Sequence, residues 1–400
     1  MDFQFSEEDE RFRQEVRDFI VRELPADWTG PPWIGEPERE TEESWQFARN
    51  FTYKMQAEKG WLTMHWPKEY GGQGASPTKQ FILNEEIGYW RAPLVDIYGP
   101  NMVGPALINF GTEEQKKEHL PKIMSGKVVW TQGFSEPDAG SDLASLKTSA
   151  VEEENCFVIN GQKTWSSIAH YADWMFVLVR TDPLAKNKHE GISLLYVDMK
   201  TPGISYSPLI NIARGHTFNE VFFENVSVPQ KNLIGQKNRG WYVAMATLDY
   251  ERSGGAARVG AAKRWIEELT RFINDKKHHG EVIPNEALIR DRLAQLAIDL
   301  EVLRLLAYRV IYEQGKGRIP TYEAAIQFSF GNDLMKRLTR IGTQTLGLYG
   351  QLGMESKWAL LNGMMQRDYL YSPALTLAGG TAEIQRNVIA SRGLGLPRTT

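Results

Sequence analysis

The middle of this 400-residue chain differs in its pattern of residues from both of its ends. From Val128 to about Gly235, short runs of β-branched and aromatic residues are separated by Gly, Pro, Asn and Asp. The runs include VVWTQGF, FVING, WMFVLVR, GISLLYVDM and EVFFENVSV. This pattern is typical of strands joined by turns, so the sequence predicts a β-domain in the middle of the chain.

Apolar residues at helical spacing mark the segment before this β-domain. Ser6 followed by Asp9 has the form of a capping box, and it opens an amphipathic helix that we expect to end at Pro25. A second helix is expected from Ser76-Pro77 through Trp90, with the proline in the first turn. The N-terminal part is therefore expected to be mostly helical.

A further N-terminal helix is expected to start at Thr112, with Gln115 completing its cap, and to stop before Pro121. After the β-domain, the spacing predicts one long helix from Trp241 to about Lys276. More helices are expected within residues 285–315, 320–348 and 381–392. Two helical regions thus flank the β-domain.

Composition and charge exclude several classes of protein. A hydrophobic fraction of 42% with 24% charged residues excludes a disordered or collagen-like chain. A net charge of −4 without a long Lys/Arg run argues against a nucleic-acid partner. Cys156 is the single cysteine, so no internal disulfide and no metal site are predicted. The acidic N-terminus and the lack of a run of 18 apolar residues predict a cytoplasmic protein without membrane attachment.

Two motifs in the β-domain carry residues suited to binding a cofactor. The segment from Gln132 to Ser141, QGFSEPDAGS, combines hydroxyl groups with a Gly-containing turn whose backbone N–H groups could hold an anion. Taken alone, such a segment is more often an ordinary turn. Asn160-Gly161 predicts a second, tight turn, and QKTWSS follows it.

With three other motifs, these two form an ordered set. EPDAGSD, NGQKTWSS, ENVSVP, LDYER and GGTAEIQR occur in this order, and together they resemble the acyl-CoA dehydrogenase family over essentially the whole chain. The resemblance implies an α+β multidomain fold with an N-terminal α-helical domain (1–125), a β-barrel-like middle domain (126–235) and a C-terminal four-helix-bundle domain (236–400). It also implies that FAD is the cofactor and an acyl-CoA thioester the substrate.

The resemblance assigns the flavin contacts of the middle domain. It implies that Phe134 and Ser135 lie against the isoalloxazine, and that Ser141 lies near the pyrophosphate and the CoA chain. Trp165 would pack on the flavin. Ser167 takes the place of a hydroxyl residue that donates to flavin N5, where a donor supports the charge of the reduced flavin. The cofactor-binding residues implied for this domain are Gln132, Phe134, Ser135, Gly140, Ser141, Trp165, Ser166 and Ser167.

The C-terminal domain of the family contributes FAD contacts across a dimer interface. Gln344 and Gly347 match the family's Gln-x-x-Gly segment. Thr381 resembles a helix N-cap whose free N–H groups suit a phosphate, with Glu383 as a nearby polar contact. A complete site would then need two subunits.

The catalytic base is the point at which this chain differs from most of the family. The implied reaction removes the α-hydrogen of the thioester as a proton and the β-hydrogen as hydride, giving a trans-2-enoyl-CoA. Most members carry the base, a Glu, just before the Gly-Thr of the C-terminal motif, where this chain has Gly379. A minority, including the isovaleryl and long-chain types, carry it on the helix that opens the C-terminal domain. Glu251 in LDYER matches that arrangement.

Neighbouring residues are assigned to the substrate in the same way. Asp249 and Arg252 would meet the pantetheine arm and the thioester, although a surface ion pair is the ordinary role of such an Arg. Backbone N–H groups at Gly379 or Gly380 would polarise the thioester oxygen. The helical base together with Gly379 resembles members that accept branched, alicyclic, aromatic or dicarboxylic acyl groups.

One departure from the family and several alternatives stay open. Where the family has an Arg-x-x-Phe-Gly turn that reaches the partner's FAD, this chain has residues 276–280, KKHHG. Retained flavin motifs and a base favour a homo-oligomer (dimer or tetramer), with a heterotetramer as the alternative. An electron-transfer flavoprotein is the implied electron acceptor. A flavin monooxygenase or oxidase of the same fold, or a subunit without catalytic activity, are the competing functions.

Overall fold

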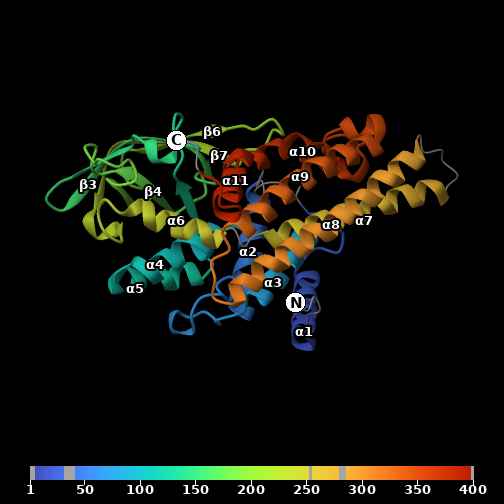
Figure 1. Cartoon of the computed structure of the whole chain (residues 1–400), viewed down its shortest axis with the longest axis horizontal. Coiled ribbons are helices and arrows are strands. Elements are labelled where there is room, and N and C mark those ends of the chain that lie inside the picture. Colours follow the sequence, from blue (N-terminus) through green and yellow to red (C-terminus); the bar gives the residue numbers. More distant parts are fainter. Residues whose placement is uncertain (1–4, 31–40, 252–254, 279–284, 398–400) are drawn as a thin grey trace. The chain divides into compact units, whose positions relative to one another are not determined.

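The computed structural model describes residues 5–30, 41–251, 255–278 and 285–397 (Figure 1). The chain divides into two compact units, each assembled from separate parts of the sequence. The helical unit comprises Met1–Pro37, Ser76–Pro93 and Arg252–Thr400, and the β-unit comprises Glu38–Ala75 and Leu94–Glu251. The three domain ranges expected from the sequence stay a prediction.

The β-unit contains the predicted central sheet. Its eight strands follow the order β6-β7-β3-β2-β4-β5-β8, and β1 pairs in parallel with β4. The strands are β1 (Trp130–Gly133), β2 (Ser149–Glu152), β3 (Cys156–Ser167), β4 (Trp174–Arg180), β5 (Ile192–Asp198), β6 (Ile204–Leu209), β7 (Phe218–Pro229) and β8 (Leu233–Ile234).

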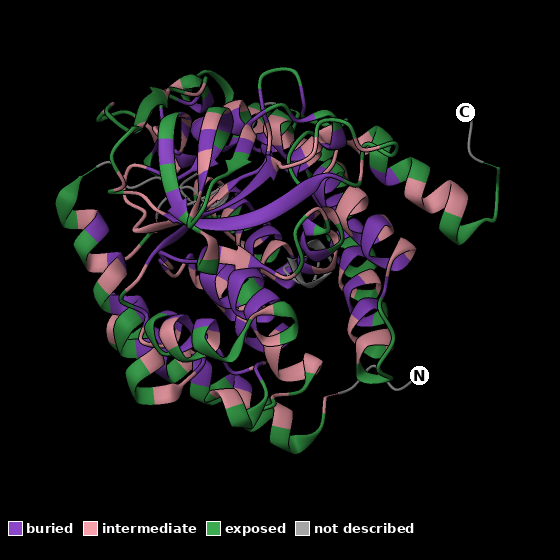
Figure 2. Cartoon of the chain, turned by 90° about the vertical axis from the view of Figure 1, so that its left-hand side faces the viewer, coloured by how far each residue is buried: buried purple, intermediate pink, exposed green. Residues whose placement is uncertain are grey.

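Alternation of side chains along β4 divides the core of the β-unit in two. Phe176 and Leu178 belong to one buried cluster, whereas Met175, Val177 and Val179 belong to the other. Figure 2 shows the central strands buried along most of their length. Helical residues join the first cluster. The helices of this unit are α2 (Glu42–Lys59), α4 (Gly104–Phe110), α5 (Glu113–Met124) and α6 (Gly240–Glu251), with short turns η1 (Lys68–Tyr70), η2 (Gly99–Val103), η3 (Leu143–Ser145) and η4 (Gln230–Asn232).

The tight turn predicted at Asn160-Gly161 is wrong, because both residues lie inside β3. The pairing of β3 with β7 shifts register between Ile159 and Gly161, as in a β-bulge. Gly161 has φ +146°, and a Cβ atom there would come within 2.7 Å of Thr148 Cα. The glycine therefore permits a close backbone approach within a strand, which a sequence cannot distinguish from a turn.

The predicted end of the helix that starts at Thr112 is also wrong. α5 continues through Pro121 to Met124. A proline inside a helix removes one backbone hydrogen bond, but Leu120 and Ile123 in this last turn are buried in the first core cluster. Their burial offsets the loss of that bond.

The helical unit is built around α7, α8 and α9, which pack side by side in Figure 1. The capping boxes predicted at Ser6 and Thr112 are confirmed, and the helix predicted from Ser76-Pro77 through Trp90 is present with Ser76 as its N-cap. The long helix expected from Trp241 is described as α6 and α7, and residues 252–254 lie outside the described part. The helices of this unit are α1 (Glu7–Glu23), α3 (Pro77–Trp90), α7 (Gly255–His278), α8 (Glu286–Gly315), α9 (Tyr322–Thr345), α10 (Met364–Tyr371) and α11 (Ala382–Val388), with short turns η6 (Gly347–Gln351), η7 (Leu360–Gly363), η8 (Ser372–Thr376) and η9 (Ile389–Gly393).

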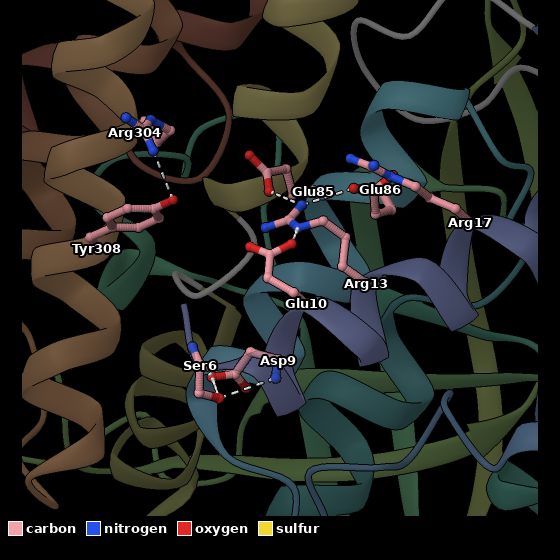
Figure 3. Close-up of polar contacts among 9 residues, drawn as sticks. All are labelled: Ser6, Asp9, Glu10, Arg13, Arg17, Glu85, Glu86, Arg304 and Tyr308. Carbon is pink, nitrogen blue, oxygen red and sulfur yellow. Dashed lines mark hydrogen bonds and ion pairs between the residues drawn. The ribbon is translucent and has the colours of Figure 1, made fainter. Parts of the chain in front are cut away.

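A buried charge cluster joins α1 to α3 within the helical unit (Figure 3). Arg13 Nη1 donates to Glu85 Oε2 at 2.5 Å and to Glu86 Oε1 at 2.8 Å. Arg17 Nε donates to the other carboxylate oxygen of Glu86 at 2.9 Å. Because these carboxylates are withdrawn from water, both guanidinium groups are needed to compensate their charge.

Within the described ranges, no helix combines the length and the apolar character that crossing a membrane would require.

Candidate functional site

The two cofactor motifs of the β-unit are joined by direct contacts between β3 and the loop after β1. Lys163 Nζ donates to the Phe134 carbonyl at 3.1 Å and to Glu136 Oε1 at 2.8 Å. Thr164 N donates to the Ser135 carbonyl at 2.9 Å. The strand thereby fixes the loop at three successive residues.

The Lys163–Glu136 pair is buried and ionised. Burial lowers the pKa of Lys163 to about 8, against the opposing effect of Glu136. Burial also opposes ionisation of Glu136, but the charge of Lys163 and hydrogen bonds from residues 147 and 148 hold the pKa of this carboxyl below its usual value. Both groups are therefore charged at neutral pH, and the pair supports the loop structurally.

The residues of this loop differ in what they present to a ligand. The Phe134 side chain is buried in the first core cluster, with its ring centroid 5.1 Å from that of Phe176. Ser135 is half-buried, and Gly140 and Ser141 are exposed. A Cβ atom at Gly140 would meet no atom within 4 Å, so a ligand could approach the backbone there. Contact of the Phe134 side chain with a flavin stays a prediction.

Trp165 presents a large apolar surface to solvent. Its side chain is 60% exposed, and its backbone has φ +58° where the pairing of β3 with β7 shifts register. A non-glycine residue in the left-handed region costs about 1–3 kcal/mol, and such strained residues cluster at ligand sites. An exposed indole held by strained backbone suits stacking against a flat aromatic group.

The two serines after Trp165 are buried and have unused hydrogen-bonding capacity. The Ser166 hydroxyl has no partner among the residues that the structure describes. The Ser167 hydroxyl accepts a hydrogen bond from Tyr98 Oη at 3.0 Å. The Ser167 carbonyl accepts from Thr131 Oγ1 at 2.6 Å, which holds the residue from a second side.

A histidine pair and an asparagine fix this end of β3. Asn219 Nδ2 donates to the Ser166 carbonyl at 3.2 Å and to His170 Nδ1 at 3.0 Å, and Asn219 Oδ1 lies 2.8 Å from His216 Nε2. The two imidazoles are stacked with centroids 4.0 Å apart. Burial, followed by the proximity of His216, lowers the pKa of His170 to about 4, so His170 is neutral at physiological pH.

Sequence reasoning missed several of these supporting residues. Lys163 lies within the NGQKTWSS motif, but the motif does not indicate its role, and Asn219 lies outside the five motifs. No local signal marks either residue, because Lys163 lies between Gln162 and Thr164 and Asn219 lies between Phe218 and Glu220. Their burial, and with it the need of their polar groups for partners, is evident only in the fold.

The predicted C-terminal cofactor residues all lie in the helical unit. Gln344 is exposed, and its Oε1 accepts from Arg292 Nη1 at 2.6 Å. Gly347 has φ +61° and begins η6. Thr381 caps α11 by accepting from Ile384 N at 3.2 Å, which confirms the predicted cap. Glu383 is exposed in the first turn of that helix.

Gly379 faces an aromatic ring that the sequence analysis did not foresee. Its φ is +65°, and a Cβ atom there would lie 2.8 Å from Cζ of Phe328 on α9. Gly380 follows with φ +93°, and Gln385 Nε2 donates to the Gly379 carbonyl at 3.0 Å. Neither the backbone nor the space at position 379 suits a side chain.

Three predicted residues fall at the edge of the described part. Glu251 is the last residue of α6, which also contains Asp249, but neither side chain is among those described. Arg252 lies outside the described residues. Of the KKHHG segment, α7 contains the residues up to His278, and residues 279–280 lie outside the described part.

The residues of the β-unit fit FAD. Trp165 offers a flat apolar surface, Ser167 offers a hydroxyl group close to it in the sequence, and the loop through Gly140 and Ser141 offers accessible backbone. The strained, exposed indole is a feature that a bound aromatic cofactor would explain. Within the described residues, no cluster of His, Cys, Asp and Glu side chains could hold a metal ion.

Comparison with protein families gives a consistent result along the chain. Residues 6–127 match the family model described as "Acyl-CoA dehydrogenase, N-terminal domain". Residues 131–226 match "Acyl-CoA dehydrogenase, middle domain", and residues 238–394 match "Acyl-CoA dehydrogenase, C-terminal domain".

Individual relatives are similar over their whole length. The acyl-CoA dehydrogenase IpdE1 of Mycolicibacterium smegmatis is 35% identical over 97% of this chain and 98% of its own. Acyl-CoA dehydrogenase FadE26 of Mycobacterium tuberculosis is 33% identical over 100% of this chain and 99% of its own.

Solved structures agree with these relatives. The structure described as "Tcur3481-Tcur3483 steroid ACAD" is 32% identical, with a TM-score of 0.89 over 100% of both chains. The crystal structure of the ChsE4-ChsE5 complex from Mycobacterium tuberculosis is 33% identical, with a TM-score of 0.86 over 100% of both chains.

Proposed function

This chain belongs to the acyl-CoA dehydrogenase family of FAD-dependent oxidoreductases, and on that basis we propose that Glu251 is the base that takes the α-proton of a bulky, ring-containing acyl-CoA. When bound, FAD supplies the acceptor for the β-hydrogen and its electron pair. The C–H electron pair left at the α-carbon forms the new double bond, so the products are the trans-2-enoyl-CoA and reduced flavin.

The observation that carries the choice of base is the relationship between Gly379 and Phe328. At the position where most of the family has a Glu, the backbone is left-handed and the Phe328 ring fills the space of a side chain. A carboxylate must therefore come from elsewhere. Glu251, at the end of α6 and within the LDYER motif, matches the family's other location for the base.

The thioester needs further groups from the chain. The α-proton is a very weak acid, so the charge that develops on the thioester oxygen requires hydrogen-bond donors. We assign this task to the backbone N–H groups of Gly379 or Gly380. Asp249 and Arg252 are proposed to contact the pantetheine arm and the thioester end, and Ser141 the CoA chain.

The cofactor contacts are proposed in two groups. In the β-unit, Trp165 would stack on the ring system, Ser167 would donate to flavin N5, and Gln132, Phe134, Ser135, Gly140 and Ser166 would line the site. In the helical unit, Gln344, Gly347, Thr381 and Glu383 would contact the FAD of a second subunit. The exposed Trp165 indole and the accessible backbone at Gly140 support the first group.

We propose a steroid-type, fused-ring acyl group as the substrate. The support is the similarity to a structure described as a steroid ACAD. The proposed location of the base on a helix agrees with it, because that location resembles family members that accept branched or bulky acyl groups. The similar ChsE4-ChsE5 structure is described as a complex, which supports the heteromeric alternative to the predicted homo-oligomer.

Anaerobic bleaching of the bound flavin tests the reaction and the substrate together. Purified holoprotein is mixed with steroid side-chain, aryl, dicarboxylic and straight-chain acyl-CoA thioesters while the visible flavin band is recorded. We expect the steroid-type thioesters to bleach the flavin fastest. Bleaching by straight chains alone would refute the substrate class. Failure with every thioester, together with rapid oxygen consumption by the chemically reduced protein, would favour an oxidase or monooxygenase.

The base is tested with Glu251→Gln and a matched control, Glu43→Gln, at an exposed position on α2. Glu251→Gln should retain FAD and bind acyl-CoA, yet lose about 10²- to 10⁴-fold in the bleaching rate, the usual contribution of a general base. The control should match the parent. A fully active Glu251→Gln protein would show that the base is a different residue.

A further inference from the structure

We propose that Tyr98 is a positioning residue for the flavin, because its hydroxyl group holds the Ser167 hydroxyl in the orientation that donates to the flavin ring. This inference rests on the proposed contact between Ser167 and flavin N5. It adds a residue from the loop before η2, to which the sequence analysis assigned no role.

The geometry determines which way each hydroxyl donates. Tyr98 Oη donates to Ser167 Oγ at 3.0 Å, and the two residues are only 7% and 4% exposed. A serine hydroxyl has one proton and two lone pairs. Since the oxygen accepts from Tyr98, its own proton points in another direction, and none of the described residues takes it as an acceptor. The Ser167 proton is therefore left for a ligand.

Ser167 cannot easily turn away from this arrangement. Its carbonyl accepts from Thr131 Oγ1 at 2.6 Å, and its backbone pairs with Phe218 on β7. The preceding carbonyl, that of Ser166, is held by Asn219. With the backbone fixed in this way, the two side-chain torsions of Ser167 are the freedom that remains, and the hydrogen bond from the Tyr98 hydroxyl restricts them.

Tyr98 is itself held in place by the buried carboxyl group of Asp96. Asp96 Oδ1 accepts from the backbone N–H groups of Tyr98 at 3.1 Å and of Gly99 at 2.8 Å, where the π-helical turn η2 begins. The tyrosine ring packs in the first core cluster, 6.0 Å from the ring of Phe176. π-Helical turns occur frequently at functional sites, and a group that is locked by packing and hydrogen bonds is preorganised for its task.

The hydrogen bond from Tyr98 affects how easily the bound flavin would be reduced. A donor at N5 would withdraw electron density from the atom of the oxidised ring that receives the hydride, and a hydroxyl that accepts one hydrogen bond donates more strongly in a second. Without the Tyr98 hydroxyl, the Ser167 hydroxyl would sample other torsions and donate more weakly. A net hydrogen-bond contribution of ordinary size corresponds to a change of about 3- to 10-fold in the equilibrium constant for flavin reduction.

The test compares Tyr98→Phe, Ser167→Ala, the double variant and a control, Tyr196→Phe. Tyr196 is another buried tyrosine of the same core cluster, and its hydroxyl donates to the Lys231 carbonyl at 3.3 Å. The midpoint potential of bound FAD is measured against reference dyes in the ligand-free holoprotein, so no substrate has to be known. Thermal unfolding of each variant reports any loss of structure separately.

We expect Tyr98→Phe to shift the midpoint potential, with a tenfold effect equal to about 30 mV for a two-electron couple. The change should disappear in the Ser167→Ala background, and Tyr196→Phe should leave the potential unchanged. An equal shift in both backgrounds, or the same shift in Tyr196→Phe, would overturn the inference, because the hydroxyl would then act without Ser167.

The design also distinguishes this inference from the function on which it rests. If Ser167→Ala shifts the potential and Tyr98→Phe does not, the positioning role of Tyr98 is wrong, and the flavin contact of Ser167 stands. If Ser167→Ala leaves both the potential and the flavin spectrum unchanged, the proposed N5 donor is wrong, and the role of Tyr98 falls with it.

Discussion

Lys163 on β3 reaches Glu136 in the loop after β1, with 2.8 Å between Nζ and Oε1. Both side chains are almost completely withdrawn from solvent. The pair connects the two motifs that carry the proposed flavin contacts, and the same ammonium group donates to the Phe134 carbonyl. The shape of the cofactor loop therefore depends on an ion pair whose two side chains are not among the proposed FAD contacts.

Lys163→Met should destabilise the protein by about 3–5 kcal/mol, because it leaves the carboxylate of Glu136 buried without a counter-charge. Thermal unfolding and retention of FAD on gel filtration measure the effect. The double variant Glu136→Gln/Lys163→Met removes both charges and should recover part of the loss. If the single variant were as stable as the double one, the ion pair would not be the support of the loop.

Asn219→Ala should reduce the affinity for FAD more than it reduces the unfolding free energy. The substitution releases the Ser166 carbonyl and both imidazoles, so the segment carrying Trp165 and Ser167 loses an anchor. We expect about a tenfold increase in the dissociation constant, the size of one lost hydrogen bond of ordinary strength. Titration of the apoprotein with FAD, followed by flavin fluorescence, measures it.

The matched control for Asn219→Ala is Asn160→Ala. Asn160 also makes amide hydrogen bonds to a residue near β3, donating to Asn225 Oδ1 at 3.1 Å, but it lies at the bulge and not beside Trp165. It should leave FAD affinity close to that of the parent. An equal loss of affinity in both variants would indicate general loosening of the sheet.

Asp96→Asn should change how stability depends on pH. Burial, with a smaller effect of Asp173, raises the pKa of Asp96 to about 7, against the hydrogen bonds that its carboxyl accepts from backbone N–H groups. Between pH 4 and 7 the carboxyl group of Asp96 loses its proton in the unfolded chain and keeps it in the folded chain. The contribution of Asp96 to the unfolding free energy therefore falls as the pH rises through that window. An asparagine retains the acceptor for Tyr98 N and has no proton to lose.

The unfolding free energy of Asp96→Asn relative to that of the parent should therefore rise by at most about 4 kcal/mol between about pH 4 and about pH 7. Above pH 7 the difference should stay constant. Urea unfolding at several pH values measures the difference. Asp138→Asn, at an exposed carboxylate 3.7 Å from Lys147, is the control and should show no such trend. A difference between Asp96→Asn and the parent that stayed constant across pH would contradict the raised pKa.

Much of the fold could be predicted because its signals are local. The helix caps at Ser6, Ser76 and Thr112 depend on residues three positions away, and the strand runs depend on alternation along the chain. The errors at Gly161 and Pro121 have a common cause. At both positions a residue that usually ends a strand or a helix lies inside one. Gly161 stays within β3 because it permits the close approach of Thr148, and Pro121 stays within α5 because Leu120 and Ile123 beside it are buried.

The candidate site was predictable to a different degree. Trp165 and Ser167 could be assigned because they lie within motifs that a whole family shares. Tyr98 and Asn219 could not be assigned, because each acts through a residue 69 or 53 positions away in the sequence. The role of Phe328 opposite Gly379 was likewise invisible, since it depends on the packing of α9 against a later loop.

Gly379→Ala tests why the chain has no side chain at the usual position of the base. The substitution adds two costs, that of a left-handed backbone with φ +65° and that of a Cβ atom 2.8 Å from Phe328 Cζ. Gly347→Ala separates them, because Gly347 has nearly the same φ, +61°, with no atom within 4 Å of its Cβ position. We expect Gly347→Ala to cost about 1 kcal/mol of unfolding free energy and Gly379→Ala about 2–3 kcal/mol more.

Phe328→Ala in the Gly379→Ala background removes the clash with the new Cβ atom but leaves a cavity in place of the ring. It should therefore lower the unfolding free energy by less than Phe328→Ala does in the parent. For the same reason, Gly379→Glu should not restore flavin bleaching to Glu251→Gln, because the new carboxylate would stand in a strained backbone against the Phe328 ring. Thermal unfolding and anaerobic bleaching of the double variant check this. A bleaching rate near that of the parent would mean that a glutamate at position 379 can act as the base. The lack of space at Gly379 would then not explain a base on α6.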